Sequence, residues 1–304
     1  MKEGRLLIEK GTLWESIVRS TRSAIAQRAI LPIPTEYAFI EDSGMRFFVR
    51  ILAGLRKKDE AATKKGPDSG PAGIIDPFLP PEKDLLLGDI SDTHLAVLNK
   101  FNVVKHHLLM VTRTFEEQDT LLTLADFEAL WLCMAEFEGL AFYNGGREAG
   151  ASQQHKHLQM VPLPLAPKGP AIPIAPLLAR APMSGIGTIP GLAFQHAFVR
   201  LDRDLLETPR EAAIQTCDLY RAMLASVNME ISSGCGPARQ SQPYCFLATR
   251  EWLLLVPRTR EFFENISFNA LAFAGSLFIR DDQQLRRLRS VGPMKALRSV
   301  AVAT

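Results

Sequence analysis

The chain has 304 residues, 47% of them hydrophobic and 22% charged, so it is long enough for a substantial core and has an ordinary globular composition. Its 35 basic and 33 acidic residues leave a formal charge of +2, which excludes nucleic acid and an anionic membrane surface as default partners. Since no apolar signal region follows Met1 and no apolar run is long enough to cross a bilayer, we expect a cytoplasmic protein.

The first third of the chain predicts one helix, one strand and one loop. Residues 12–30 place apolar and charged residues at a helical period, which indicates an amphipathic helix. Residues 45–52, Met-Arg-Phe-Phe-Val-Arg-Ile-Leu, are typical of a strand. From 57 to 73 the composition changes to Lys, Gly, Pro and Asp, as in a mobile loop.

The next segments predict sheet and a capped helix. Residues 95–104 and 107–112 indicate two strands across a short connection. Thr123 and Asp126 have the spacing of a capping box, so a helix is expected from there to about residue 139. A further strand is expected over 154–161, before a proline.

The last third repeats a strand, turn, strand theme. The proline-rich residues 162–190 predict a long ordered loop or a crossing segment, and residues 208–232 predict a helix. Strands are expected over 244–249 and 252–258. Because residues 252–258 align with 107–113, each ending in Val-x-Arg, we predict two related sheet-forming halves.

The four cysteines show no Cys-x-x-Cys pair, so neither a zinc knuckle nor a disulfide framework is indicated. Free cysteine is among the most buried residue types. We therefore predict free, mostly buried thiols at Cys133, Cys217, Cys235 and Cys245.

The most informative segment is His155-Lys156-His157-Leu158-Gln159, which places two imidazoles and a carboxamide on one face of the strand expected there. Three interpretations are open: hydrogen-bonded core histidines, ligands of zinc or iron, or a nucleophile for transfer at phosphorus. No nearby Cys-x-x-Cys or His-x-x-Glu supplies a third metal ligand.

Attack on phosphorus needs a neutral imidazole whose other ring nitrogen is held by an acceptor. It also needs donors for the phosphate oxygens. The preceding loop, residues 144–154, is rich in glycine, small and amide residues, and its backbone N–H groups can approach an anion. The second half has no histidine after His196, so at most one half carries histidine chemistry.

Residues 150–159, Gly-Ala-Ser-Gln-Gln-His-Lys-His-Leu-Gln, resemble the active-site segment of the diadenosine tetraphosphate (Ap4A) phosphorylases, also called ATP adenylyltransferases. That family belongs to the histidine-triad (HIT-like) superfamily, in the branch of galactose-1-phosphate uridylyltransferase. The resemblance covers roughly residues 34–280. Further matching segments are Asn99-Lys100-Phe101, Phe142-Tyr143-Asn144-Gly145, Thr249-Arg250-Glu251-Trp252, Val256-Pro257-Arg258 and residues 269–275.

The resemblance implies an α+β, HIT-like fold, mainly antiparallel sheet with packed helices and two related halves in one chain. We expect residues 1–304 to form a single compact unit. Approximately residues 1–165 would be the N-terminal half with the histidine motif, and approximately 190–304 the C-terminal half that completes the substrate site.

The resemblance also implies roles for individual residues. His157 would be the nucleophile, His155 would hold and tune the site, and Gln159 stands where histidine hydrolases have a third histidine. A carboxamide donates to phosphate oxygens but carries no proton at neutral pH, so the site should favour phosphate over water. The implied substrate contacts are Lys58, Asn99, Lys100, Asn144, Gly150, Ala151, Ser152, Gln153, Asn269, Ala270, Leu271, Ser276 and Arg280, with no metal bound by the protein.

Some of these assignments have competitors or departures. Lys57, Lys64 and Lys65 compete with Lys58 for the phosphate contact. Arg280 stands where the family has lysine, and it keeps the charge while offering a bidentate fork. Ser276 replaces a larger apolar residue of some relatives. Structural or surface roles are expected for His106, His107 and His196.

We therefore expect a nucleotidyltransferase that converts Ap4A and phosphate reversibly to ADP and ATP through an adenylyl-histidine. The expected partners are nucleotides, with Mg²⁺ or another divalent cation bound through them, no organic cofactor, no nucleic acid and no membrane, and the oligomeric state is open. Three alternatives remain: a uridylyltransferase of the galactose-1-phosphate type, a non-catalytic nucleotide-binding protein and a metal-dependent hydrolase.

Overall fold

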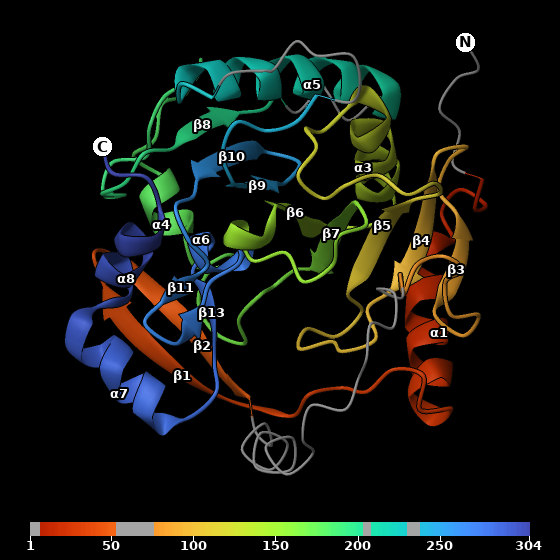
Figure 1. Cartoon of the computed structure of the whole chain (residues 1–304), viewed down its shortest axis with the longest axis horizontal. Coiled ribbons are helices and arrows are strands. Elements are labelled where there is room, and N and C mark those ends of the chain that lie inside the picture. The colour runs from red at the N-terminus through yellow and green to blue at the C-terminus, as the bar shows by residue number, and fades with distance from the viewer. Residues whose placement is uncertain (1–6, 53–75, 203–207, 230–237) are drawn as a thin grey trace, which may run out of the picture.

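The computed structural model describes residues 7–52, 76–202, 208–229 and 238–304. Over these ranges the chain forms a large sheet with helices along one face and a smaller sheet against the other (Figure 1). The loop expected over 57–73, with Lys58, lies outside the described residues. Among the described residues no helix combines the length and hydropathy that a membrane-spanning helix needs.

The large sheet has eight strands in the order β3-β4-β5-β7-β6-β9-β10-β8, and every neighbouring pair is antiparallel. The expected α+β class with mainly antiparallel sheet is confirmed. The strands are β3 (Leu86–Asp89), β4 (His94–Leu98), β5 (Leu108–Thr112), β6 (Gly139–Gly145), β7 (His157–Pro162), β8 (Ala197–Arg200), β9 (Tyr244–Ala248) and β10 (Trp252–Pro257).

Strand β4 is shorter than the segment 95–104 predicted for it. It ends at Leu98 because the Asn99 side chain accepts a hydrogen bond from the Phe101 N–H (3.1 Å), which turns the chain. Strand β7 begins at His157 rather than at 154, and His155 forms only an isolated bridge with Glu117. The predicted β5, β9 and β10 are each within one residue of their observed bounds.

The pairing of β6 with β9 makes one continuous sheet of strands from both ends of the chain. It runs from Ala141 opposite Ala248 to Gly145 opposite Tyr244. Strand β8 lies at the edge beyond β10 and was not predicted. The division into halves near residues 165 and 190 stays a prediction.

Three helices pack on one face of the large sheet: α1 (Leu13–Ala26), α3 (Leu124–Glu136) and α5 (Pro209–Ser226). The capping box of α3 is confirmed, because Thr123 and Asp126 bond reciprocally through side chain and backbone. Helix α3 ends before the predicted residue 139, since Phe137 is already extended and β6 follows at Gly139. Three of the cysteines, Cys133, Cys217 and Cys245, are free and buried as predicted, whereas Cys235 is outside the described ranges.

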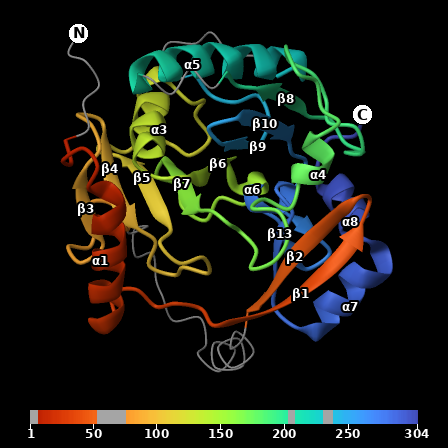
Figure 2. The same ribbon diagram turned by 180° about the vertical axis from the view of Figure 1, so that it is seen from behind.

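The other face of the sheet is covered partly by a three-stranded sheet, β1 (Thr35–Asp42), β2 (Met45–Leu52) and β13 (Ser276–Ile279) (Figure 2). Strand β13 runs parallel to β2, with Ser276 opposite Phe48, and so joins chain segments far apart in sequence. The remaining elements on this side are the short helix η1 (Arg147–Ala149), α4 (Ala175–Leu178), the hairpin β11 (Phe262–Phe263) and β12 (Ile266–Ser267), α6 (Ala270–Phe273), α7 (Asp282–Val291) and α8 (Pro293–Val300).

Candidate functional site

The first residues of β7 meet the preceding loop at a cavity of about 230 Å³ on the face of the sheet opposite α3. Leu158 and Met160 belong to the core beneath the helices, so the alternating His157 and Gln159 point the other way. The cavity brings together six residues predicted from the sequence. They are Asn99, Lys100, Ser152, Gln153, His157 and Gln159, and they face apolar residues that include Phe78, Val97 and Leu109.

His157 is held in one orientation at the start of β7. Its Nδ1 donates to the carbonyl oxygen of His155 (2.8 Å), so the proton of the neutral ring is on Nδ1 and the lone pair is on Nε2. The pKa of His157 is lowered to about 4 because burial penalises the charged imidazole, which outweighs the backbone hydrogen bond. The ring is therefore neutral at pH 7, with Nε2 as its nucleophilic atom.

His155 lies behind this nucleophile and is only 1% exposed. Its Nε2 lies 2.8 Å from the carbonyl oxygen of Thr112, and its Nδ1 lies 2.7 Å from a carboxylate oxygen of Asp76. Both ring nitrogens therefore have a hydrogen-bond partner, which fixes the orientation of the ring. The carbonyl of His155 holds His157, so the contacts with Thr112 and Asp76 fix the nucleophile indirectly.

Gln159 lies two residues after His157 in β7, opposite Leu109 of β5 and Phe142 of β6. It is half-buried and lines the cavity with His157. His155 does not line this cavity, so two of the three motif side chains predicted to share a face do so at the cavity itself. The reason is that β7 begins only at His157.

Asn99 is oriented by two neighbours. Its Oδ1 accepts from the Phe101 N–H, and its Nδ2 lies 3.0 Å from Nδ1 of His107. Burial lowers the pKa of His107 to about 4, although the nearby Gln159 amide favours the protonated ring. His107, for which a structural or surface role was expected, thus lies between two residues of the cavity wall. Lys100 forms an ion pair with Glu82 at the same wall.

Within the expected cradle, residues 150–153, two backbone N–H groups have no hydrogen bond to a described residue. The N–H groups of Gly150 and Ala151 bond to carbonyls of residues 146–147, whereas those of Ser152 and Gln153 make no hydrogen bond to any described residue. Both residues also line an adjacent cavity of about 850 Å³ formed with residues 240–243. Of the four N–H groups predicted to bind an anion, those of Ser152 and Gln153 are therefore the two available for it.

Gly150 is required where the loop meets the C-terminal part of the chain. Its φ is +95°, and a Cβ there would lie 3.0 Å from Cα of Asn269 and 3.0 Å from the carbonyl oxygen of Phe268. A side chain would be strained by the backbone angle and by this close approach. The loop and the start of α6 therefore contact each other directly.

Asn144 reinforces that contact from β6. Its buried side chain accepts from the Ala270 N–H (2.8 Å), and Asn269 caps α6 by accepting from the Leu271 N–H (3.1 Å). Ala270 and Leu271 are themselves buried. These four predicted contacts are thus brought together beside Gly150, where Asn144 and Asn269 bond to the backbone of α6.

Ser276 and Arg280 line neither of these two cavities. Ser276 is fully buried in β13, where its hydroxyl accepts from Arg50 (2.6 Å). Arg280 is exposed just after β13, and its N–H bonds to Gln284. Their predicted contact with substrate stays a prediction, as does that of Lys58.

Two residues of the site gave no signal in the sequence. Asp76 contacts His155 from 79 positions earlier in the chain. Gln118 binds the backbone of His157 through both ends of its amide, accepting from the N–H (2.9 Å) and donating to the carbonyl (3.3 Å). Both contacts depend on tertiary pairing, which no spacing in the sequence reveals.

Comparison with known protein families gives a match over almost the whole chain. The family model of the Ap4A phosphorylase N-terminal domain matches residues 3–180, and that of the ATP adenylyltransferase C-terminal domain matches residues 190–303. Diadenosine 5',5'''-P1,P4-tetraphosphate phosphorylase 2 of Saccharomyces cerevisiae is 25% identical over 235 residues, which cover 70% of this chain and 71% of the yeast protein. Protein APA1 of the same yeast is 25% identical over 232 residues, with the same coverage.

Solved structures show the same fold. The crystal structure of yeast Ap4A phosphorylase Apa2 has a TM-score of 0.77 to this chain at 22% sequence identity, covering 98% of this chain and 96% of that one. The structure of Apa2 in complex with Ap4A also has a TM-score of 0.77, at 20% identity, covering 98% of this chain and 99% of that one.

Proposed function

Because this chain belongs to the Ap4A phosphorylase family, we propose that it catalyses the reversible phosphorolysis of diadenosine tetraphosphate, in which Ap4A and phosphate give ADP and ATP. The observation that carries the proposal is the Nδ1–H of His157 bonded to a backbone carbonyl, which leaves the Nε2 lone pair as the nucleophile. The yeast relative solved in complex with Ap4A supports the choice of substrate.

The first step of the proposed mechanism forms a covalent intermediate. Nε2 of His157 attacks the α-phosphorus of one adenosine, a P–N bond forms, and the bond to the bridging oxygen breaks with ATP as the leaving group. The carbonyl of His155 stabilises the positive ring through the Nδ1–H. The N–H groups of Ser152 and Gln153, which bond to no described residue, would bind the phosphate oxygens together with the Gln159 amide.

In the second step an oxygen of inorganic phosphate attacks the adenylyl phosphorus. The P–N bond breaks, ADP is released and neutral His157 is restored. Gln159 cannot act as a general base towards water at neutral pH, so phosphate is favoured over water as the acceptor. Two displacements at one phosphorus should together retain its configuration.

The substrate's negative charge needs cations. Lys100 lines the cavity, and Lys58 and Arg280 are proposed as further contacts of the polyphosphate. We propose that Mg²⁺ or another divalent cation enters with the nucleotide, held mainly by phosphate oxygens. The described residues contain no group of three or more His, Cys, Asp or Glu side chains able to hold a metal ion by themselves. A cytoplasmic location is part of the proposal, and the free buried thiols fit a reducing compartment.

Product analysis with and without phosphate tests the proposal. Incubation with Ap4A and Mg²⁺ should yield ATP and ADP in equal amounts only when phosphate is present, and labelled phosphate should appear as the β-phosphate of ADP. The expected exchange of labelled phosphate into ADP should occur without a second nucleotide. ATP and AMP formed without phosphate would instead identify a hydrolase, and intact Ap4A under all conditions would identify a nucleotide-binding protein.

A further inference from the structure

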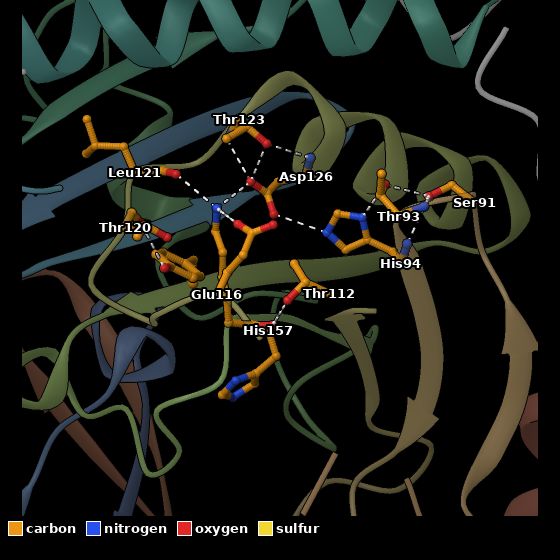
Figure 3. A network of polar contacts seen from close by, with 12 residues as sticks. Ser91, Thr93, His94, Thr112, Glu116, Thr120, Leu121, Thr123, Asp126 and His157 are labelled. Atoms are coloured by element: carbon orange, nitrogen blue, oxygen red, sulfur yellow. Dashed lines mark hydrogen bonds and ion pairs between the residues drawn. The ribbon is translucent and has the colours of Figure 1, made fainter. Parts of the chain in front are cut away.

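Lys156, between the two motif histidines, has a fully buried side chain that the mechanism above does not use. Its ammonium group donates to a carboxylate oxygen of Asp126 (2.7 Å), to the carbonyl of Leu121 (3.0 Å) and to Glu116 (3.3 Å). Each of the three N–H donors of the ammonium group thus has one acceptor. Figure 3 shows His157 on one side of this segment, with Asp126 and Thr123 on the other.

Asp126 is the centre of this buried network. It is 1% exposed, and besides Lys156 it accepts from Nε2 of His94 (3.1 Å) and from the N–H and hydroxyl of Thr123 at the start of α3 (Figure 3). Burial alone would raise the pKa of Asp126, but the charge of Lys156 and the hydrogen bond from His94 hold it well below its ordinary value. The network therefore ties residue 156 to the first turn of α3 through an ionised carboxylate.

The backbone of Lys156 is also fixed. Its N–H donates to the Glu116 carbonyl (2.8 Å), and its own carbonyl accepts from the Thr112 N–H (3.2 Å). These bonds permit a second pairing, displaced by one residue, in which successive side chains exchange faces. In that pairing residue 156 would point into the cavity and His157 would point towards α3. Backbone bonds do not distinguish the two. Apolar burial of Leu158 and Met160 favours the observed pairing, and Lys156 adds a charged side chain whose buried partner lies on the same face.

We propose that the Lys156–Asp126 ion pair is a positioning device that sets the register of the nucleophile-bearing segment and so directs His157 into the cavity. A buried ion pair is a weak source of stability compared with apolar packing, and its best-attested use is to specify one arrangement among several. The inference rests on the proposed function, because its effect is read through adenylyl transfer by His157.

The decisive variant is Lys156→Met with Asp126→Asn, which removes both charges together and leaves no unpaired buried ion. The amide introduced at position 126 would keep an oxygen for Thr123. We expect the rate of adenylyl-His157 formation in a single turnover, measured by mass spectrometry of the quenched protein, to fall at least tenfold. The nucleotide Kd and the Tm should change little. The matched control is Arg221→Met with Asp218→Asn, an exposed ion pair on α5, which should keep the wild-type rate.

A second variant keeps the inference testable if the double variant does not fold. Lys156→Gln retains a donor for Asp126 but removes the charge, and we expect a similar fall in the transfer rate with an unchanged nucleotide Kd. A folded double variant, or a folded Lys156→Gln variant, that forms adenylyl-His157 at the wild-type rate would overturn the positioning role. If the wild-type protein itself formed no adenylyl-histidine, the proposed function would fail first and this role with it.

Discussion

Strands β7 and β9 lie on either side of β6 and both run antiparallel to it, yet they serve different purposes. Opposite Phe142, β7 has the half-buried Gln159 and β9 has the fully buried Leu247. Leu247 packs in a core with α6, whereas Gln159 faces the cavity. The comparison shows that the same pairing supports either chemistry or packing, according to what lies above the strand.

The difference predicts that alanine substitutions in the two strands have opposite effects on activity and stability. His157→Ala should reduce phosphorolysis by about 10⁴-fold or more, because it removes the nucleophile, with little loss of stability. Leu247→Ala should cost about 2–5 kcal/mol of unfolding free energy by leaving a cavity, with turnover per folded molecule retained. Initial rates with Ap4A and urea denaturation measure both. Substantial exchange of labelled phosphate into ADP by His157→Ala would contradict the assignment.

Replacing Gln159 of β7 tests whether its carboxamide makes the site favour phosphate over water as the acceptor. Gln159→His should raise the phosphate-independent formation of AMP by about 10²-fold, because an imidazole can accept a proton from water. The ratio of AMP to ADP at fixed phosphate measures this change. Gln27→His, at the exposed C-terminal end of α1, is the matched control. An unchanged ratio in Gln159→His would show that the residue does not set the choice of acceptor.

Acid should destabilise the β7 region in particular. The pKa values of His157 and His107 are about 4 in the folded chain because of burial, against an ordinary value of 6.5. The unfolded chain therefore binds more protons between these values, and the stability present above pH 6.5 is lost as pH falls towards 4. Each histidine should contribute a loss of about 2 kcal/mol between pH 7 and 5.

Urea denaturation at several pH values checks this expectation. His157→Ala should flatten the dependence of the unfolding free energy on pH, whereas Leu247→Ala should lower the free energy without changing its slope. Equal slopes in the wild type and His157→Ala would mean that the imidazole is not buried in its neutral form.

The smallest expected effect concerns the contact that links the two regions, between Gly150 and α6. Gly150→Ala should lose about 1 kcal/mol more than Gly169→Ala, since both glycines have φ near +95° but only Gly150 meets another backbone. Gly150→Ala should also raise the KM for Ap4A a fewfold by moving Ser152 and Gln153. Equal losses of stability and an unchanged KM in the two variants would show that the contact has no role.

The sequence predicted the local elements better than their pairing. Apolar strands such as β5 and β10 and the capping box of α3 depend on neighbouring residues, so their patterns are visible directly. The parallel pairing of β13 with β2 joins residues more than 200 positions apart, and no local pattern encodes it. The short β8 was missed for a similar reason, since packing decides it. The helices α7 and α8 were missed although local signals mark them, because Asp281 caps α7 and Pro293 begins α8.

In the candidate site, too, some residues were predictable from local sequence and others depend on tertiary contacts. The His-x-His-x-Gln spacing identified the residues of β7, because alternation along a strand is a local property. Asp76, Gln118 and His107 support that segment only through tertiary contacts. The family resemblance supplied Asn144 and Asn269, whose bonds to α6 could not be derived from spacing.

The pairing of β6 with β9 also governs how this protein can be made. Once β7 has been synthesised it can pair with one edge of β6, and the other edge of β6 offers unpaired N–H and C=O groups until residues 244–248 leave the ribosome. An apolar strand with an open edge is a template for aggregation. In a polypeptide that ended before residue 244 this edge of β6 would stay open, so we expect such a fragment to aggregate more than the whole chain.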